Sequence, residues 1–141
     1  MLTRHSRLRR RTRLRPISAK RNTERNRYRR MVRAFLNAHP CCQAQKFVWK
    51  LEHDPTQVMT FIHCANQVHH RNKARGARLL DQRWWMAVGP QYHEEIETRK
   101  EWARKVGLLL PLEADADGRL PDGTQCLTTD ELLKRVEKTP F

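Results

Sequence analysis

The segment from residue 66 to residue 107 contains the pattern that most constrains the fold of this chain. Apolar and polar residues alternate over 66–70, which indicates a strand, and the bulky run "WWMAV" at 84–88 indicates a second one. A Gly-Pro pair ends this second strand, and a helix, with a break near Thr98, is expected to follow. Two strands followed at once by a helix predict a small α+β unit in which a hairpin packs on that helix.

Three histidines and one acidic residue are placed on this unit so that they can meet. His69 and His70 end the first strand, and His93 opens the helix. Glu97 lies four residues after His93, so these two side chains project from one face of the helix. A hairpin packed on the helix would bring His69, His93 and Glu97 around one point. Imidazole and carboxylate groups together suit a divalent ion such as Zn, Ni, Mn or Mg.

The two adjacent histidines pose a geometric problem, because neighbouring residues of a strand point to opposite faces. His69 and His70 can serve one site only if the strand ends or is distorted there. The residues that follow, Arg71 and Asn72, are consistent with the chain leaving the strand at that point. The alternative is that the histidines are two polar residues beside a strand, without a chemical role.

A helix is expected over 20–38, ahead of the hairpin, and Pro40 stops it. Its apolar residues form one helical stripe: Tyr28, Met31, Val32, Phe35 and Leu36. Its other faces carry five arginines: Arg25, Arg27, Arg29, Arg30 and Arg33. Such a helix can pack on a core through the stripe while it presents a basic surface to phosphates.

The net charge of +14 is concentrated near the N-terminus. Residues 1–34 hold 14 of the 29 lysines and arginines but one of the 15 acidic residues, so they carry +13 and the remainder carries +1. Residues 1–19 are expected to form a disordered basic arm whose partner is a polyanion, most often nucleic acid. A solvated tail without a partner and a mitochondrial transit peptide are the alternatives.

The segment 41–63 is less regular. Two short apolar runs flank the pair Asp54-Pro55, which favours a hairpin or a partly extended insertion. The four cysteines are irregularly spaced and do not suggest a disulfide framework, which favours a reducing, cytoplasmic compartment. Neither a secretory signal nor an apolar stretch of membrane-spanning length is visible, so no membrane partner is expected.

The C-terminal part changes in composition after Pro111. Residues 112–127 are acidic and rich in turn-forming residues, and a linker is expected there. A final helix is expected within 128–141, with Thr128 as its N-cap and Glu131 completing a capping box. The apolar side of this helix would either pack on the domain or meet a protein partner.

Four blocks of the sequence resemble those of the HNH (ββα-metal, His-Me finger) endonucleases, most closely the phage and prophage type. The blocks are "SAKRNTERNRYRRMVRAFLNAHPCC", "QVHHR", "ARLLDQRWWMAVGPQYHEEIE" and "EWARKVGLLLP". The resemblance covers about residues 18–111 and implies a ββα-metal nuclease domain over 20–111, with an N-terminal basic helix or arm and a C-terminal helix. It implies an enzyme that hydrolyses DNA phosphodiester bonds, in the cytoplasm of a bacterial host if the chain is phage-encoded.

The same resemblance implies roles for individual residues. His70 would be the general base that takes a proton from water. His69, His93 and Glu97 would hold one divalent ion (Mg, Mn, Ni or Zn), which polarises the phosphate and stabilises the leaving 3′ oxygen. The phosphate contacts are expected from the loop between the strands and from the arm: Arg71, Lys73, Arg75, Arg78, Arg9, Arg10 and Arg11.

The sequence departs from the family pattern at three places. Glu97 stands where relatives often have a histidine, which would favour Mg or Mn. Trp84 stands at the position of the asparagine that braces the loop holding the base, so an aromatic ring would brace it by packing. The two Cys-x-x-Cys pairs that bind a structural zinc in many relatives are missing, so no structural zinc is expected. Aromatic packing would replace that zinc, with these candidates: Trp49, Phe61, Trp84, Trp85 and Tyr92.

Two other functions fit the same residues. The first is a non-catalytic nucleic-acid-binding protein with a decayed HNH site, in which Trp84 and Glu97 mark the decay. The second is a basic assembly factor that meets a protein partner through the helix at 128–138.

Overall fold

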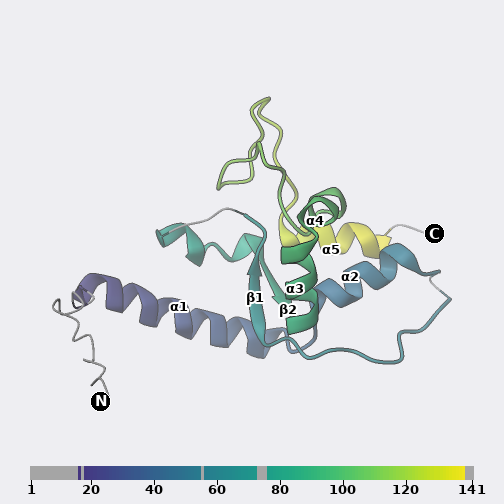
Figure 1. The fold of residues 1–141 in the computed structure, drawn as a ribbon, viewed down its shortest axis with the longest axis horizontal. Helices are drawn as coiled ribbons and strands as arrows, with labels where there is room; N and C mark the ends of the chain where they lie inside the picture. The colour runs from purple at the N-terminus through teal and green to yellow at the C-terminus, as the bar shows by residue number, and fades with distance from the viewer. Residues whose placement is uncertain (1–15, 17, 55, 73–75, 139–141) are drawn as a thin grey trace, which may run out of the picture.

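The computed structural model describes residues 16, 18–54, 56–72 and 76–138. This part of the chain contains five α-helices, two short 3-10 helices and one two-stranded antiparallel sheet, which confirms the expected α+β class. In chain order the elements are α1 (Ala19–Ala38), α2 (Gln43–Glu52), β1 (Gln67–His70), η1 (Gly76–Leu80), η2 (Gln82–Trp84), β2 (Trp85–Val88), α3 (Pro90–Thr98), α4 (Lys100–Val106) and α5 (Thr129–Lys138) (Figure 1).

The sheet lies at the centre, and helices cover it on both sides. Strand β1 pairs with β2 in a register that runs from Gln67 opposite Val88 to His70 opposite Trp85. Helices α1 and α3 both contact β1, and α2 contacts β2. All four residues of β2 are buried, because both of its faces are covered. The expected strand–strand–helix order is therefore confirmed, with the predicted break after Thr98 separating α3 from α4.

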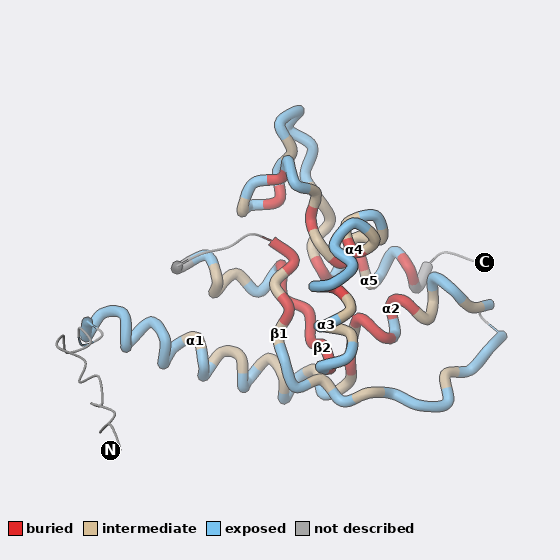
Figure 2. The backbone as a smooth tube through the Cα atoms, in the orientation of Figure 1, coloured by how far each residue is buried: buried red, intermediate tan, exposed pale blue. Residues whose placement is uncertain are grey.

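Helix α1 confirms the predicted helix and its apolar stripe. Ser18 caps its N-terminus by accepting a hydrogen bond from the Arg21 amide at 3.2 Å. The five stripe residues are half-buried, whereas the arginines predicted for the other faces are exposed (Figure 2). The helix therefore rests on the body of the molecule through one narrow face and leaves its basic surface in solvent.

The prediction of a hairpin or partly extended insertion over 41–63 is wrong for the first half of this segment, which α2 occupies, whereas the described residues of 53–63 form no helix or strand. Ala44, Phe47 and Val48 follow helical spacing and are buried. The N-cap is Cys42, whose Sγ accepts the Gln45 amide at 3.4 Å. A cysteine is not among the common N-cap residues, so the usual signal for a helix start was absent.

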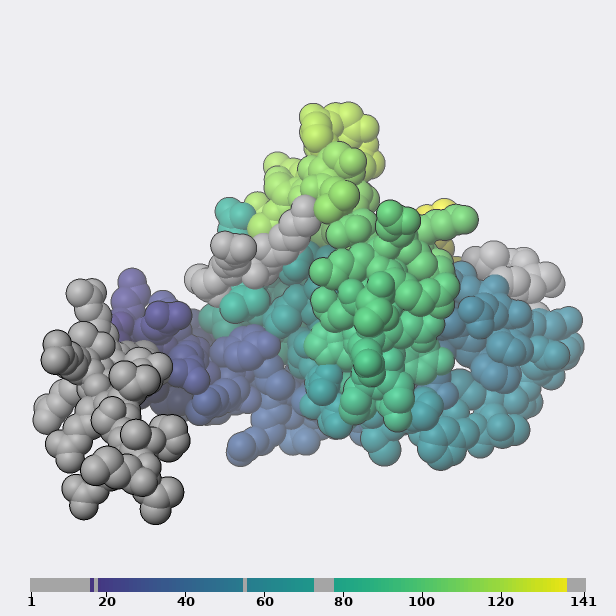
Figure 3. Space-filling model, in the orientation of Figure 1, coloured from purple at the N-terminus to yellow at the C-terminus, as the bar shows by residue number. Residues whose placement is uncertain are grey.

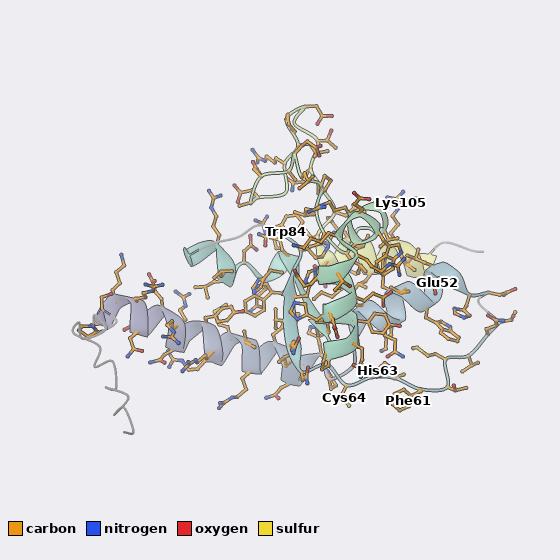
Figure 4. All side chains as sticks on the ribbon, in the orientation of Figure 1. Glu52, Phe61, His63, Cys64, Trp84 and Lys105 are labelled. Atoms are coloured by element: carbon orange, nitrogen blue, oxygen red, sulfur yellow. The ribbon has the colours of Figure 1, made fainter. Side chains whose placement is uncertain are left out.

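The expectation that five aromatic residues pack where relatives bind zinc is met by some of them and not by others. Trp84 and Trp85 are fully buried, and Tyr92 packs against the main core. Phe61 is 66% exposed and lies with His63 and Cys64 on the chain that leads from α2 to β1 (Figure 4). The assignment of Phe61 to the core is therefore wrong.

The segment 112–127, expected to be a linker, folds back on Trp84, and we call it the tongue. It projects from the body of the molecule in Figure 3. Leu110 and Ala114 form a small cluster with the Trp84 ring. Gly118, at φ +77°, lies so close to this ring that an added Cβ would be 2.4 Å from Trp84 Cη2. The tongue thus contacts the end of η2 and is not a free connection between two parts.

Helix α5 confirms the predicted C-terminal helix and its capping box. The Glu131 carboxylate accepts the Thr128 amide at 2.8 Å, and Thr128 Oγ1 accepts the Glu131 amide at 3.4 Å. Leu132 and Val136 are buried in the main core, where α5 contacts α2. The apolar side of this helix therefore packs on the domain. Among the helices in the described part of the chain, none has the length and apolarity needed to cross a membrane.

Candidate active site

His69, His93 and Glu97 meet as the sequence pattern predicts. One possible ligand atom from each of the three side chains lies within 4.8 Å of the other two. His69 comes from β1, and His93 and Glu97 come from successive turns of α3, which contacts β1. His69 is 2% exposed and Glu97 is exposed, so the group opens from the interior towards solvent.

Hydrogen bonds determine which nitrogen of each imidazole is free. His69 Nε2 lies 2.7 Å from the Leu108 carbonyl oxygen, and His93 Nδ1 lies 2.6 Å from Gln67 Oε1. Carbonyl oxygens only accept, so both of these ring nitrogens carry the proton and donate. Nδ1 of His69 and Nε2 of His93 are then the lone-pair nitrogens. Histidine ligands of metal sites commonly have this outer hydrogen bond.

The protonation state of His69 also suits a metal ligand. Burial lowers the pKa of His69 from 6.5 to about 4, and repulsion by the protonated forms of His93 and His70 and by Arg71 acts in the same direction. The hydrogen bond to Leu108 acts in the opposite direction but is the smaller effect. The imidazole is therefore neutral at physiological pH, which is the form that binds a metal ion.

The three donors fit one divalent ion with open coordination positions. Two imidazole nitrogens and one carboxylate are a donor set found in catalytic metal sites. Glu97 is paired with Lys100, whose Nζ lies 3.8 Å from Glu97 Oε2, but both side chains are more than half exposed. Such a pair contributes little free energy, so the carboxylate is free to turn towards an ion.

His70 lies on the other side of β1, against α1. His69 pairs with Met86 and His70 with Trp85 in a regular register, so the two side chains point to opposite faces. The structure does not bring His70 into the group of His69, His93 and Glu97. The ring centroids of Tyr28 and Trp85 lie 5.9 Å and 5.7 Å from that of His70. Burial and the nearby charge of His93 lower the pKa of His70, so its imidazole is neutral at physiological pH.

The polar contacts of His70 are unusual for a base. Its Nε2 lies 2.8 Å from the Tyr28 hydroxyl oxygen. Its Nδ1 is buried and has no hydrogen-bond partner in the described part of the protein. A buried polar atom without a partner is rare in folded proteins, and such atoms are often found where a ligand or water acts.

Arg71 does not lie on the surface, where a phosphate contact was expected. It is 3% exposed, and its guanidinium donates to the Gly107 carbonyl at 2.9 Å and to the Leu127 carbonyl at 3.0 Å. Burial lowers the pKa of Arg71 to about 10, so it remains charged at physiological pH. Arg71 therefore ties the end of α4 to the start of α5, and its assignment to DNA binding is corrected.

Trp84, which was expected to brace the chain at His70 by aromatic packing, supports that chain through its backbone. Its carbonyl accepts the Arg71 amide at 3.0 Å, one residue beyond His70. Its ring packs beneath the tongue (Figure 4). The rings that lie against His70 are those of Tyr28 and Trp85.

Of the predicted phosphate-binding residues, Arg78 in η1 is exposed. Lys73, Arg75, Arg9, Arg10 and Arg11 lie outside the described residues, as does the basic arm except for residues 16, 18 and 19. Helix α1, which contacts both β1 and η1, adds further exposed arginines: Arg21, Arg25, Arg27, Arg29, Arg30 and Arg33.

Two residues of the site were missed from the sequence. Gln67 lies two residues before His69, and alternate residues share one strand face, so spacing could have identified it as a partner of His93. Tyr28 was assigned only to the apolar stripe of α1. Its contact with His70 spans 42 positions, and nothing in the local sequence indicates it.

Comparisons of the chain with models of known protein families, with curated proteins and with solved structures find no match.

Proposed function

We propose that the protein is a metal-dependent endonuclease of the HNH type that hydrolyses phosphodiester bonds in DNA. The observation that supports it most is the meeting of His69, His93 and Glu97, in which hydrogen bonds define the donor nitrogens of the two histidines. A neutral His70 follows His69 on the opposite face of the same strand. The strand–strand–helix order in which these residues lie is that of the ββα-metal motif which the sequence resembles.

In the proposed reaction, His70 accepts a proton from a water molecule, and the oxygen of that water attacks the phosphorus. The bond from phosphorus to the 3′ oxygen then breaks. His69, His93 and Glu97 would hold one divalent ion, which supplies charge stabilisation at the phosphate and at the leaving oxygen. The low pKa values of His69 and His70 keep both imidazoles neutral, so one can bind and the other can accept a proton at physiological pH.

Helix α1 supports a DNA substrate. Its exposed arginines lie on a helix that contacts β1, and Tyr28 of the same helix touches His70. Arginines bound to phosphates give affinity without reading the base sequence. A DNA duplex bound along α1 would therefore have its phosphate backbone near the end of β1. If the chain is encoded by a phage or prophage, the protein would act in the cytoplasm of a bacterial host.

One observation favours the alternative, a non-catalytic nucleic-acid-binding protein. In this structure His70 Nε2 is bonded to Tyr28 and Nδ1 is buried, so neither ring nitrogen faces solvent. Under the alternative, α1 binds nucleic acid and His70 only packs between two aromatic rings.

A plasmid-nicking assay with Mg, Mn, Ni or Zn separates the two functions. The parent should cut in at least one metal, and His70→Ala should lose about 10²–10⁴-fold in rate while it keeps DNA affinity. The control is His53→Ala, which removes a histidine at the far end of α2 and should leave cutting unchanged. DNA binding by the parent without cutting in any of the four metals would select the non-catalytic alternative.

The metal ligands are tested by calorimetric titration. Glu97→Ala, which alters an exposed side chain, should weaken metal binding, and higher metal concentration should partly restore cutting. His69→Ala and His93→Ala should weaken metal binding as well, whereas His70→Ala should bind metal like the parent. Loss of metal by His70→Ala with retention by His69→Ala would reverse the roles within the pair.

A further inference from the structure

The position of the single proton on the neutral His70 ring decides whether this residue can act as a base. Its two nitrogens have different surroundings: Nε2 lies 2.8 Å from the Tyr28 hydroxyl oxygen, and Nδ1 is buried without a partner. A neutral imidazole has one N–H and one lone pair, and only the nitrogen with the lone pair can take a proton from water.

Two arrangements satisfy the Tyr28–His70 contact. If the Tyr28 hydroxyl donates to Nε2, the proton of His70 is on Nδ1, where it is a buried N–H without an acceptor. If Nε2 donates to the Tyr28 oxygen, Nδ1 has the lone pair, and the phenolic hydrogen can turn to solvent because Tyr28 is only half-buried. Buried N–H groups without an acceptor are rarer than buried acceptors without a donor, so the second arrangement is favoured.

We propose that Tyr28 is a positioning residue that accepts a hydrogen bond from His70 Nε2 and so makes Nδ1 the basic nitrogen. The catalytic meaning of this inference rests on the proposed nuclease function. With this arrangement, Tyr28 of α1 would hold the base in place, which is the role of an asparagine at position 84 in the HNH pattern. The helix that carries the exposed arginines would then also orient the base.

The aromatic surroundings make Tyr28 suitable for this role. Its ring lies nearly parallel to the His70 ring, at 25°, while Trp85 meets both rings edge-on, at 86° to His70 and 74° to Tyr28. Burial raises the pKa of Tyr28, so the phenol stays neutral over the working pH range. Packing fixes the rings and the hydroxyl selects the tautomer, so Tyr28→Phe removes the selection and keeps the packing.

The test is NMR of protein labelled with ¹⁵N in its histidine rings, at a pH where the imidazoles are neutral. The His70 signal, identified by its absence in His70→Gln, should show a protonated Nε2 and an unprotonated Nδ1. Tyr28→Phe should shift this signal towards a mixture of the two tautomers. Tyr92→Phe is the matched control, since it alters the other tyrosine of the chain, and it should leave the signal unchanged. A protonated Nδ1 in the parent, or an unchanged tautomer in Tyr28→Phe, overturns the inference.

Nicking kinetics separate this inference from the proposed function. Tyr28→Phe should lower kcat about 10- to 100-fold with KM for DNA unchanged, a smaller loss than removal of the base itself. A parent protein that cuts no DNA in any of the four metals overturns the proposed function, while the NMR measurement still decides the tautomer. Normal kcat in Tyr28→Phe, in a parent that cuts, overturns the positioning role.

A second and independent inference concerns Cys41 and Cys64, which face each other across an isolated antiparallel bridge. The Cys42 amide donates to the His63 carbonyl at 2.8 Å, and the Ala65 amide donates to the Pro40 carbonyl at 2.9 Å. These two bonds flank the cysteines, so the cysteines are a non-hydrogen-bonded pair. Residues in such a pair have Cα atoms about 4.5 Å apart and close side chains.

We infer that Cys41 and Cys64 are a thiol pair that glutathione disulfide can convert to a reversible disulfide. A Cα separation of about 4.5 Å lies within the range that disulfides span. Both thiols are reduced in this structure, and Cys64 is exposed to an oxidant. In the exchange, each glutathione sulfur leaves as a thiol, the two cysteine sulfurs join, and the two protons go to the glutathione thiols.

Peptide mass mapping after treatment with glutathione disulfide tests this pair. A peptide linked through Cys41 and Cys64 should appear and should be lost on adding dithiothreitol. Cys126→Ser, at a half-buried cysteine on the tongue, is the matched control and should form the same link. Formation of only mixed disulfides with glutathione, or a link through another cysteine, overturns the inference.

Discussion

At the scale of single residues, His69 couples the stability of the fold to pH. The pKa of His69 is about 4 in the folded state, whereas it would be 6.5 in an unfolded chain. As the pH falls, the unfolded state therefore takes up the proton before the folded state does. The stabilising effect of the neutral form is complete above pH 6.5 and is lost as the pH falls from 6.5 towards 4. A shift of this size corresponds to at most about 3 kcal/mol.

The prediction is checked by urea unfolding at several pH values, in the presence of a chelator so that no metal contributes. The free energy of unfolding of the parent should fall between pH 6.5 and pH 4. His69→Gln, which cannot take up the proton, should show a shallower fall over the same window. Parallel curves for the two proteins would contradict a neutral, buried His69.

Arg71 is predicted to stabilise the folded state and not to bind DNA. Arg71→Met keeps the aliphatic part of the side chain but leaves the Gly107 and Leu127 carbonyls without their donor. Loss of these bonds should lower the free energy of unfolding by about 2–4 kcal/mol. Arg78→Met, at an exposed arginine, should change it by about 0.5 kcal/mol or less. Equal stability of the two variants in urea unfolding would refute the role assigned to Arg71.

At the scale of elements, the contact between the tongue and Trp84 can be isolated with two glycines. Gly118 and Gly123 both have positive φ, at +77° and +87°, so alanine has a similar backbone cost at each. An alanine Cβ at 118 would lie 2.4 Å from Trp84 Cη2, whereas at 123 it would meet nothing within 4 Å.

Gly118→Ala should therefore be less stable than Gly123→Ala. The alanine at 123 should cost about 1 kcal/mol, and the displacement of the Trp84 ring should add about 1–3 kcal/mol at 118. Thermal unfolding of both variants measures the difference, which reports the packing of the tongue alone. Equal melting temperatures would mean that the tongue does not rest on Trp84 in solution.

Elements with a regular sequence pattern were predictable, and the one helix that was missed, α2, has a physical reason for it. Helix α1 has five apolar residues at helical spacing, and α5 has a capping box, so both were found. Helix α2 has the spacing of Ala44, Phe47 and Val48 but begins at an uncommon N-cap, Cys42. The aromatic and β-branched residues in this short run made it look extended.

In the candidate site too, contacts set by local spacing were predictable from the sequence, whereas contacts between segments distant in sequence were not. The one-turn spacing of His93 and Glu97 on α3, with His69 on the neighbouring strand, was sufficient to predict that the three side chains meet. The contacts of Arg71 with Gly107 and Leu127, and of His70 with Tyr28, join segments distant in sequence. Those contacts depend on how whole elements pack, which a local pattern does not contain.

At the scale of the whole molecule, the basic helix α1 and the helix α3 that holds two of the proposed metal ligands both contact β1, from its two sides. Residues 1–34 carry +13 of the net charge of +14, and α1, which holds the second half of this segment, contacts β1 (Figure 1). The near-neutral remainder holds the core and the proposed metal ligands. Under the proposed function, the binding of DNA and its hydrolysis fall to different parts of the chain, so we expect that the two can be weakened separately.

Deletion of residues 1–17 should weaken DNA binding without harming the fold or the site. It removes seven arginines and keeps Ser18, which caps α1. Each phosphate neutralised on duplex DNA contributes about −0.9 to the slope of log affinity against log salt, so loss of seven contacts would flatten the slope by at most about 6.

Fluorescence anisotropy at several salt concentrations measures the slope, and urea unfolding serves as the control for the fold. The exposed arginines of α1 should retain a residual slope in the truncated protein. If the slope is instead the same with and without residues 1–17, those seven arginines are not at the DNA interface, and α1 alone carries the electrostatic part of binding.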